Sequence, residues 1–134
     1  MRLLCCIINI KILSYIIVMH IHLILTYIGT PNNYWEHYLN SALLNNDILT
    51  LYVFSDIDIP ESYIEKYKNV KFIPITFDEI KNRLCSFLKK NLNLDFHIND
   101  FANIKVHKLC DIKVIFRYLF SEYITFSSDE DYVG

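Results

Sequence analysis

Apolar residues along the chain fall into short runs with two different spacings. Residues 21–28 and 48–54 are almost continuously apolar, which is typical of parallel strands that are covered on both faces. Residues 34–44 carry apolar side chains at helical spacing, and Asn32 or Asn33 precedes them as a candidate N-cap. The pattern therefore predicts a strand, a short amphipathic helix and a second strand.

A third strand and a capped helix follow. Residues 70–75 have strand character, and Pro74 within them favours an edge position or a strand end. Thr76 is followed three residues later by Glu79, which is the capping-box pattern. We therefore expect a helix from residue 77 to about residue 90.

The remaining segments are less regular. Residues 58–68 predict a loop with one helical turn, and residues 91–106 predict a long loop of the kind that tends to be functional. Residues 108–123 predict a third helix, and residues 132–134 resemble the start of another strand. Because strands and helices alternate, the predicted fold class is α/β, with a Rossmann-like, mostly parallel sheet flanked by helices and incomplete at the C-terminus.

The N-terminal part has two interpretations. Residues 3–28 are almost wholly apolar and have the length of a membrane span. Lys11 in the middle costs about 2.5–3.5 kcal/mol in a bilayer, whereas each Leu or Ile returns only about 0.3–0.6 kcal/mol, so insertion is close to break-even. Since residues 21–28 are better explained as a buried strand, a span through residues 3–20 would have close to the minimum length.

We accordingly divide the chain into an apolar extension, residues 1–20, and a folded part, residues 21–134. The extension is either a membrane anchor or a packed or dispensable segment, and Met19 is a further candidate for the working start, which would leave residues 1–18 upstream of the protein. The sequence therefore does not decide whether the protein is cytoplasmic or membrane-associated.

Composition narrows the function classes. The 13 basic and 15 acidic residues give a net charge of −2, which disfavours nucleic acid as a partner. Gly29 and Gly134 are the only glycines, so no glycine-rich phosphate loop can be written. The four cysteines form no C-x-x-C pair, and the five histidines, including His20 and His22 on one strand face, form no metal-ligand set.

Candidate binding residues follow the first two strands, because ligands of such sheets bind outside the carboxyl ends of the strands. Thr26, Tyr27 and Gly29 end the first strand, and Asp56 ends the second. An Asp in that position suits a ribose hydroxyl. The alternative is that Ser55 and Asp56 only cap the following turn.

Two D-x-D patterns could chelate Mg²⁺ or Mn²⁺ beside a diphosphate. They are residues 56–58 and residues 129–131. Three-residue patterns arise easily by chance, so we expect neither to be a metal site.

The run Lys108-Leu109-Cys110-Asp111-Ile112-Lys113 precedes an aromatic helix and then residues 129–134, Asp-Glu-Asp-Tyr-Val-Gly. This order resembles an uncharacterised family of presumptive GT-A glycosyltransferases, whose Lys-x-x-Asp helix is followed by a similar segment and a D-x-D strand. Residues 25–35, 53–56 and 70–80 resemble the family's first strand and helix, second strand, and third strand and capped helix.

The resemblance implies a nucleotide-sugar ligand of the UDP- or GDP-sugar type. Asp56 would contact its base or ribose, and Lys108 and Asp111 would lie at its ribose-diphosphate edge. Without the resemblance, Lys108 and Asp111 read as a surface i,i+3 ion pair. Mn²⁺ or Mg²⁺ is implied only for a full-length relative, because the D-x-D strand would follow Gly134.

We therefore expect the N-terminal nucleotide-sugar-binding part of a glycosyltransferase-like protein, truncated before the D-x-D strand and inactive alone. Two alternatives are a small membrane-anchored structural or interaction protein without enzymatic activity, and a degenerate product.

Overall fold

The computed structural model describes residues 20–125 and 132–134. Residues 1–19 of the apolar extension, with Cys5 and Cys6, and the D-x-D pattern at residues 129–131 lie outside the described residues. No helix in the described ranges is long and apolar enough to cross a membrane. The predicted anchor through residues 3–20 thus stays a prediction.

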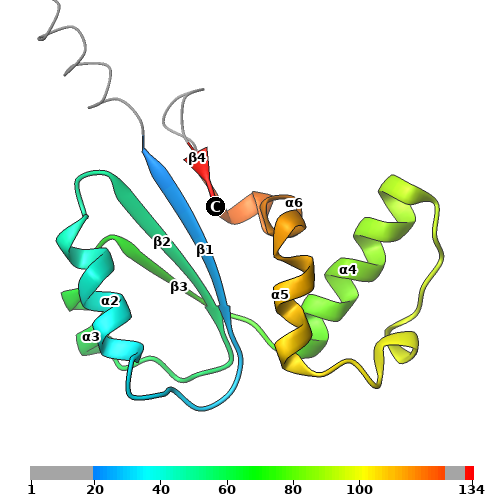
Figure 1. The fold of residues 1–134 in the computed structure, drawn as a ribbon, viewed down its shortest axis with the longest axis horizontal. Helices are drawn as coiled ribbons and strands as arrows, with labels where there is room; N and C mark the ends of the chain where they lie inside the picture. The colour runs from blue at the N-terminus through cyan, green and yellow to red at the C-terminus, as the bar shows by residue number, and fades with distance from the viewer. Residues whose placement is uncertain (1–19, 126–131) are drawn as a thin grey trace, which may run out of the picture.

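A parallel sheet forms the centre of the fold, with the strand order β3-β2-β1-β4 (Figure 1). Its strands are β1 (Ile21–Tyr27), β2 (Leu49–Ser55), β3 (Val70–Pro74) and the two-residue β4 (Tyr132–Val133). β4 pairs with Ile21 and His22 at the start of β1. The α/β class, the parallel pairing and the strand at residues 132–134 are confirmed, and Pro74 ends the edge strand as predicted.

Helices cover both faces of the sheet (Figure 1). On one side are α2 (Trp35–Leu44) and α3 (Glu61–Lys66); on the other are α4 (Phe77–Leu92), α5 (Leu109–Ile112) and α6 (Phe116–Leu119). Because side chains alternate along a strand, β2 contributes to two separate cores. Leu51 and Val53 belong to the core on the α2 side, and Tyr52 and Phe54 to the core on the α4–α6 side.

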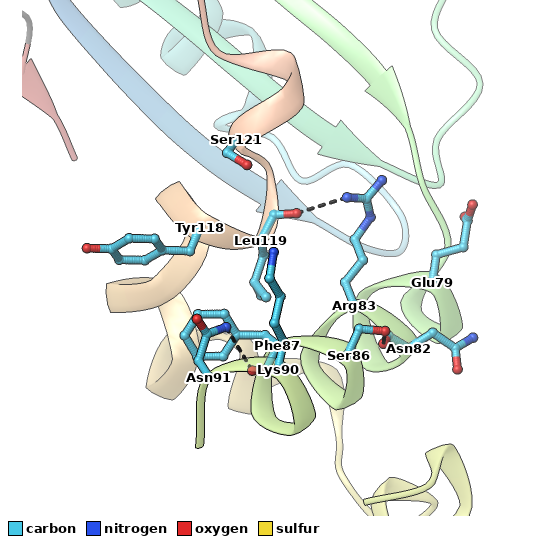
Figure 2. Close-up of a pocket in the computed structure, with 10 residues that line it drawn as sticks. All are labelled: Glu79, Asn82, Arg83, Ser86, Phe87, Lys90, Asn91, Tyr118, Leu119 and Ser121. Carbon is cyan, nitrogen blue, oxygen red and sulfur yellow. Dashed lines mark hydrogen bonds between the residues drawn. The ribbon is translucent and has the colours of Figure 1, made fainter. Parts of the chain in front are cut away.

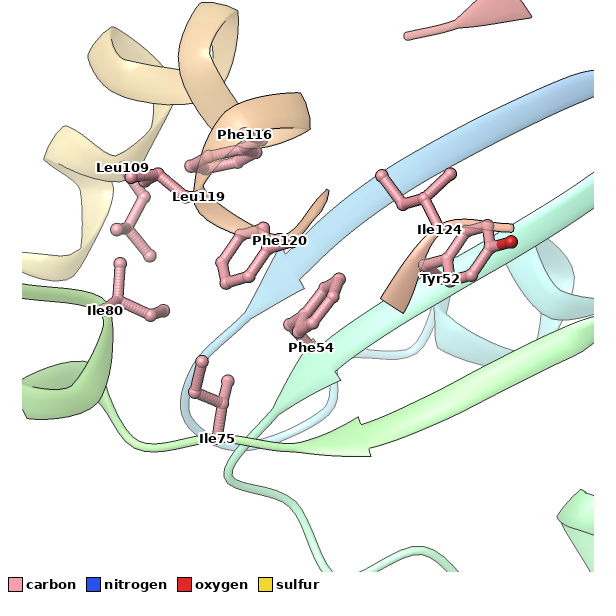
Figure 3. Packing of buried hydrophobic residues seen from close by; sticks show 9 residues of the cluster. All are labelled: Tyr52, Phe54, Ile75, Ile80, Leu109, Phe116, Leu119, Phe120 and Ile124. Carbon is pink, nitrogen blue, oxygen red and sulfur yellow. The ribbon is translucent and has the colours of Figure 1, made fainter. Parts of the chain in front are cut away.

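The two cores differ in character. The α2-side core is built on Leu39, which is fully buried, together with Trp35, Ala42, Leu49, Tyr67 and Val70. The core on the α4–α6 side is aromatic at its centre, where the rings of Phe54 and Phe120 stack at 3.9 Å between centroids (Figure 3). With both faces covered, β2 reads as a continuous apolar run.

The prediction of one continuous helix over residues 108–123 is wrong. The segment consists of short α and 3₁₀ turns: η2 (Val106–Lys108), α5, η3 (Lys113–Ile115), α6 and η4 (Ser121–Tyr123). Ile112, Val114 and Ile115 are β-branched and therefore weak helix formers, which favours the tighter 3₁₀ geometry at this point. Approximate helical spacing survives, because Leu109, Phe116 and Leu119 are all buried in the same core.

Two smaller boundaries also differ from expectation. The N-cap of α2 is Tyr34 rather than Asn32 or Asn33, and Asn32 instead accepts the Tyr34 backbone N–H through Oδ1 at 3.0 Å. The long loop after α4 contains a 3₁₀ turn, η1 (Ile98–Phe101).

The capping box of α4 forms as predicted. Thr76 Oγ1 accepts the Glu79 backbone N–H at 3.2 Å, and Glu79 Oε2 accepts the Thr76 backbone N–H at 2.7 Å. The hydrogen bond from the Thr76 backbone lowers the pKa of Glu79. Helix α4 therefore begins at a position fixed by two residues.

Thr76→Ala is expected to lower the free energy of unfolding by about 1 kcal/mol, because the first turn of α4 loses one cap acceptor. Urea unfolding followed by circular dichroism measures the change in the free energy of unfolding.

The contribution of Glu79 to the stability is present above the ordinary pKa of 4.5 and is lost as the pH falls through the lowered folded-state value. Glu79→Gln should therefore show a shallower loss of stability between about pH 5 and pH 3 than the wild type. Equal slopes would contradict the assigned role of Glu79.

Candidate functional site

A hydrogen bond joins the loops that follow β1 and β2 at the carboxyl edge of the sheet. The strand register pairs Tyr27 with Ser55, which places Gly29 and Asp56 just beyond the paired residues. The Gly29 backbone N–H donates to Asp56 Oδ1 at 2.8 Å. Gly29 has φ +107°, a conformation that glycine adopts at little cost, so its backbone can turn toward the carboxylate.

Tyr27 organises the loop between β1 and α2. Its hydroxyl donates to the Thr30 carbonyl at 3.2 Å and accepts the Asn32 backbone N–H at 3.0 Å. Its ring lies 4.9 Å from the ring of Trp35, on the α2 side of the sheet. Thr26 is half-buried and, by strand alternation, faces the opposite side. The side chains of Thr26 and Tyr27 therefore lie on opposite faces of the sheet, and Tyr27 supports the loop through its hydrogen bonds to Thr30 and Asn32.

The turn after β2 separates the two interpretations of Ser55 and Asp56. Ser55, which is buried, accepts the Ile57 backbone N–H through Oγ at 3.0 Å, so Ser55 does cap its own turn. Asp56 is exposed and reaches across to Gly29 instead. Among the described residues, Asp56 Oδ2 has no hydrogen-bond partner. A hydroxyl group arriving at this edge would find a carboxylate oxygen held in place by its neighbour.

Lys108 and Asp111 lie at the start of α5. Lys108 Nζ is 3.3 Å from Asp111 Oδ2, and the two side chains are 57% and 65% exposed. Such an exposed i,i+3 pair contributes a few tenths of a kcal/mol. Within residues 20–125 and 132–134, no hydrogen bond or ion pair links this pair to Gly29 or Asp56. Four of the six predicted site residues thus form two pairs, Gly29 with Asp56 and Lys108 with Asp111.

No group of three or more His, Cys, Asp or Glu side chains that could hold a metal ion occurs among the described residues. In the first D-x-D pattern, Asp56 accepts a hydrogen bond from the Gly29 backbone. His20 and His22 share a strand face, with ring centroids 5.0 Å apart, but they bond Thr50 and Tyr52 respectively.

A hollow of about 570 Å³ lies between α4 and the α6–η4 segment (Figure 2). Arg83 crosses one end of it and donates to the Leu119 carbonyl at 2.9 Å and to Glu122. The rings of Phe87 and Tyr118 meet at 6.1 Å farther along. The sequence does not predict this hollow, because its two walls come from segments that are far apart in the chain, residues 79–91 and residues 118–121.

A family model described as "Family of unknown function (DUF6625)" matches residues 23–134, which is most of the chain. The chain belongs to this family. Searches of curated proteins and of solved structures found no match. The matched range begins within β1 and includes all the candidate site residues, so this DUF6625 member carries both the Gly29–Asp56 and the Lys108–Asp111 pairs inside the family region.

Proposed function

We propose that the chain is the nucleotide-sugar-binding part of a GT-A-type glycosyltransferase-like protein. The observation that carries the proposal is the Asp56 carboxylate, fixed by the Gly29 backbone at the carboxyl edge of a parallel sheet. In the order β3-β2-β1-β4, β2 and β3 are added on one side of β1 and β4 is added on its other side, so the direction in which successive strands are added reverses at β1. In open α/β sheets, ligands bind outside the carboxyl ends of the strands at such a reversal.

The chemistry of the two pairs suits the parts of a nucleotide sugar. Asp56 would accept hydrogen bonds from the ribose hydroxyls, as an acidic residue at a strand end does in dinucleotide-binding folds. Lys108 would be a point-charge partner for the diphosphate. Because the Lys108–Asp111 pair is exposed and weak, exchanging its carboxylate for a phosphate oxygen costs little.

Titration of the ¹⁵N-labelled chain with UDP and GDP, each with and without Mn²⁺, tests the proposal. We expect the amides of Gly29 and Asp56 to shift, and Asp56→Asn to weaken binding roughly tenfold to a hundredfold, because a hydrogen bond to a charged group contributes about 1.5–3 kcal/mol. Asp47→Asn is the matched control, since Asp47 is exposed and lies just before the start of β2, at the amino ends of the strands. Shifts confined to other regions, or equal losses in both variants, would rule the proposal out.

A further inference from the structure

A small pocket lies at the carboxyl ends of β2 and β3 and is lined in part by the loop that follows β2. Its volume is about 210 Å³. Ser55 and Asp58 contribute its polar groups. The apolar lining includes Val53, Ile57, Ile59, Ile64, Phe72 and Pro74. The pocket thus combines one carboxylate with an apolar wall.

The pocket adjoins the candidate site, one strand farther along the sheet. Ser55 pairs with Tyr27 of β1 on one side and with Pro74 of β3 on the other. Neighbouring strands are about 4.8 Å apart. Asp56 and Asp58 are two residues apart in the chain, so their Cα atoms lie within about 7 Å of each other. Because the base of a nucleoside is bonded directly to its ribose, a ribose held at Asp56 brings the base within reach of this pocket.

The size of the pocket suits one ring system rather than a complete ligand. A cavity of about 150 Å³ can take up benzene, whereas sites for complete small-molecule ligands measure about 300–1,000 Å³. The volume of this pocket lies between these values. Its rim is accessible, because Asp58 and Pro74 are exposed and Ile64 is 53% exposed. A flat base can therefore enter from solvent, and the apolar wall is open to every base alike.

Asp58 supplies the group that selects among the bases. Ser55 Oγ already accepts the Ile57 backbone N–H at 3.0 Å. Asp58 lines the pocket, is exposed, and has no hydrogen-bond or ion-pair partner among the described residues. A carboxylate only accepts hydrogen bonds, and it has two oxygens with which to do so. The ligand edge that complements it carries two adjacent donors.

Guanine is the base with such an edge. Its N1–H and N2–H groups lie side by side and can donate to both oxygens of one carboxylate, which is a strong, charge-assisted arrangement. Uracil has a single N–H between two carbonyl oxygens, and those oxygens repel a carboxylate. Adenine and cytosine carry an acceptor nitrogen next to their amino group. The free carboxylate at the pocket therefore favours guanine.

We propose that this pocket binds a guanine base, so that the nucleotide recognised by the chain is GDP or a GDP-sugar rather than a UDP-sugar. The Asp58 carboxylate accepts the N1–H and N2–H groups, the apolar wall contacts the faces of the base, and Asp56 holds the attached ribose. This inference rests on the proposed function, because it names the base of the nucleotide that Asp56 would bind. It also gives the second acidic residue of the first D-x-D pattern a role.

Binding of four diphosphates to the wild-type chain tests the choice of base without any substitution. We expect GDP to bind about tenfold to a hundredfold more tightly than UDP or ADP, the factor that a hydrogen bond to a charged group contributes. ADP controls for the size of the purine ring. Inosine diphosphate lacks only the N2 amino group of GDP, so its affinity should lie between those of GDP and ADP. GDP should also shift the amides of Asp58, Ile59 and Phe72 in the ¹⁵N spectrum.

Asp58→Asn should change which base is preferred. The amide has one acceptor oxygen and one donor group, which complement the N1–H and the C2 carbonyl of xanthine. The variant should bind GDP about tenfold to a hundredfold more weakly than the wild type does. It should also bind xanthosine diphosphate more tightly than GDP, a gain that a folding defect cannot produce. Asp56→Asn should weaken GDP and UDP binding by the same factor, and Asp47→Asn should change neither.

The possible results separate this inference from the proposed function. Equal binding of GDP, ADP and UDP, with shifts at Gly29 and Asp56, would overturn the guanine assignment and leave nucleotide binding in place. A preference for GDP that persists in Asp58→Asn would overturn the assignment of the base to this pocket. If none of the nucleotides bound, the proposed function would fail, and the inference that rests on it would fail as well.

Discussion

Phe120→Ala is expected to lower the free energy of unfolding by about 3–5 kcal/mol, the usual cost of deleting a buried Phe side chain. Phe120 is fully buried, stacks on Phe54 at 3.9 Å and lies 5.6 Å from the ring of Phe116. Its ring therefore joins the sheet to the α6–η4 segment. Since small domains are stable by only about 5–15 kcal/mol, a large part of the stability depends on this residue. Urea unfolding at constant pH measures the change.

Phe96→Ala is the matched control. Phe96 is 41% exposed and meets only the ring of Phe101, at 5.7 Å, among the ring contacts of the described residues. Its loss should cost less than about 1 kcal/mol. The Phe54→Ala and Phe120→Ala single variants, compared with the double variant, give the coupling energy between the two rings. Aromatic pairs contribute about 0.5–1.5 kcal/mol beyond burial. A Phe120→Ala effect no larger than that of Phe96→Ala would show that α6 and η4 are not held through this pair.

Local signals account for the parts of the fold that the sequence predicted. The strands at β1 and β2, the edge position of Pro74 and the capping box at Thr76 each depend on residues close together in the chain. The broken helix after residue 108 depends on a balance between β-branched residues and the packing of Phe116 and Phe120 in the core. That balance is set by tertiary contacts, which periodicity does not report.

The sequence predicted where the candidate site lies, at the carboxyl ends of the strands, but not which of its residues contact one another. The rule for carboxyl ends brings Gly29 and Asp56 to the same edge, but their hydrogen bond depends on the register of Tyr27 with Ser55. Register is set by packing on both faces of the sheet and by the turn.

The sheet must be covered on both faces for its carboxyl edge to keep this geometry. On the α2 side, Leu39 is fully buried and belongs to the cluster that also contains Leu51 and Val53 of β2. The Tyr67 hydroxyl donates to Asn40 Oδ1 at 3.0 Å and so ties the residue next to Leu39 to the segment before β3. Loss of packing at Leu39 should thus loosen α2 together with the loop that Tyr27 supports.

Leu39→Ala is expected to lower the free energy of unfolding by about 2–5 kcal/mol, from lost burial and the cavity left between α2 and the sheet. Leu44→Ala provides a control of the same residue type on the same helix, because Leu44 is 85% exposed, and its effect should stay within about 0.5 kcal/mol. Urea unfolding gives both values, and amide exchange at Gly29 reports whether the loop loosens. If Leu39→Ala destabilised the chain while Gly29 exchange stayed at the wild-type rate, the coupling between α2 packing and the Gly29–Asp56 edge would be excluded.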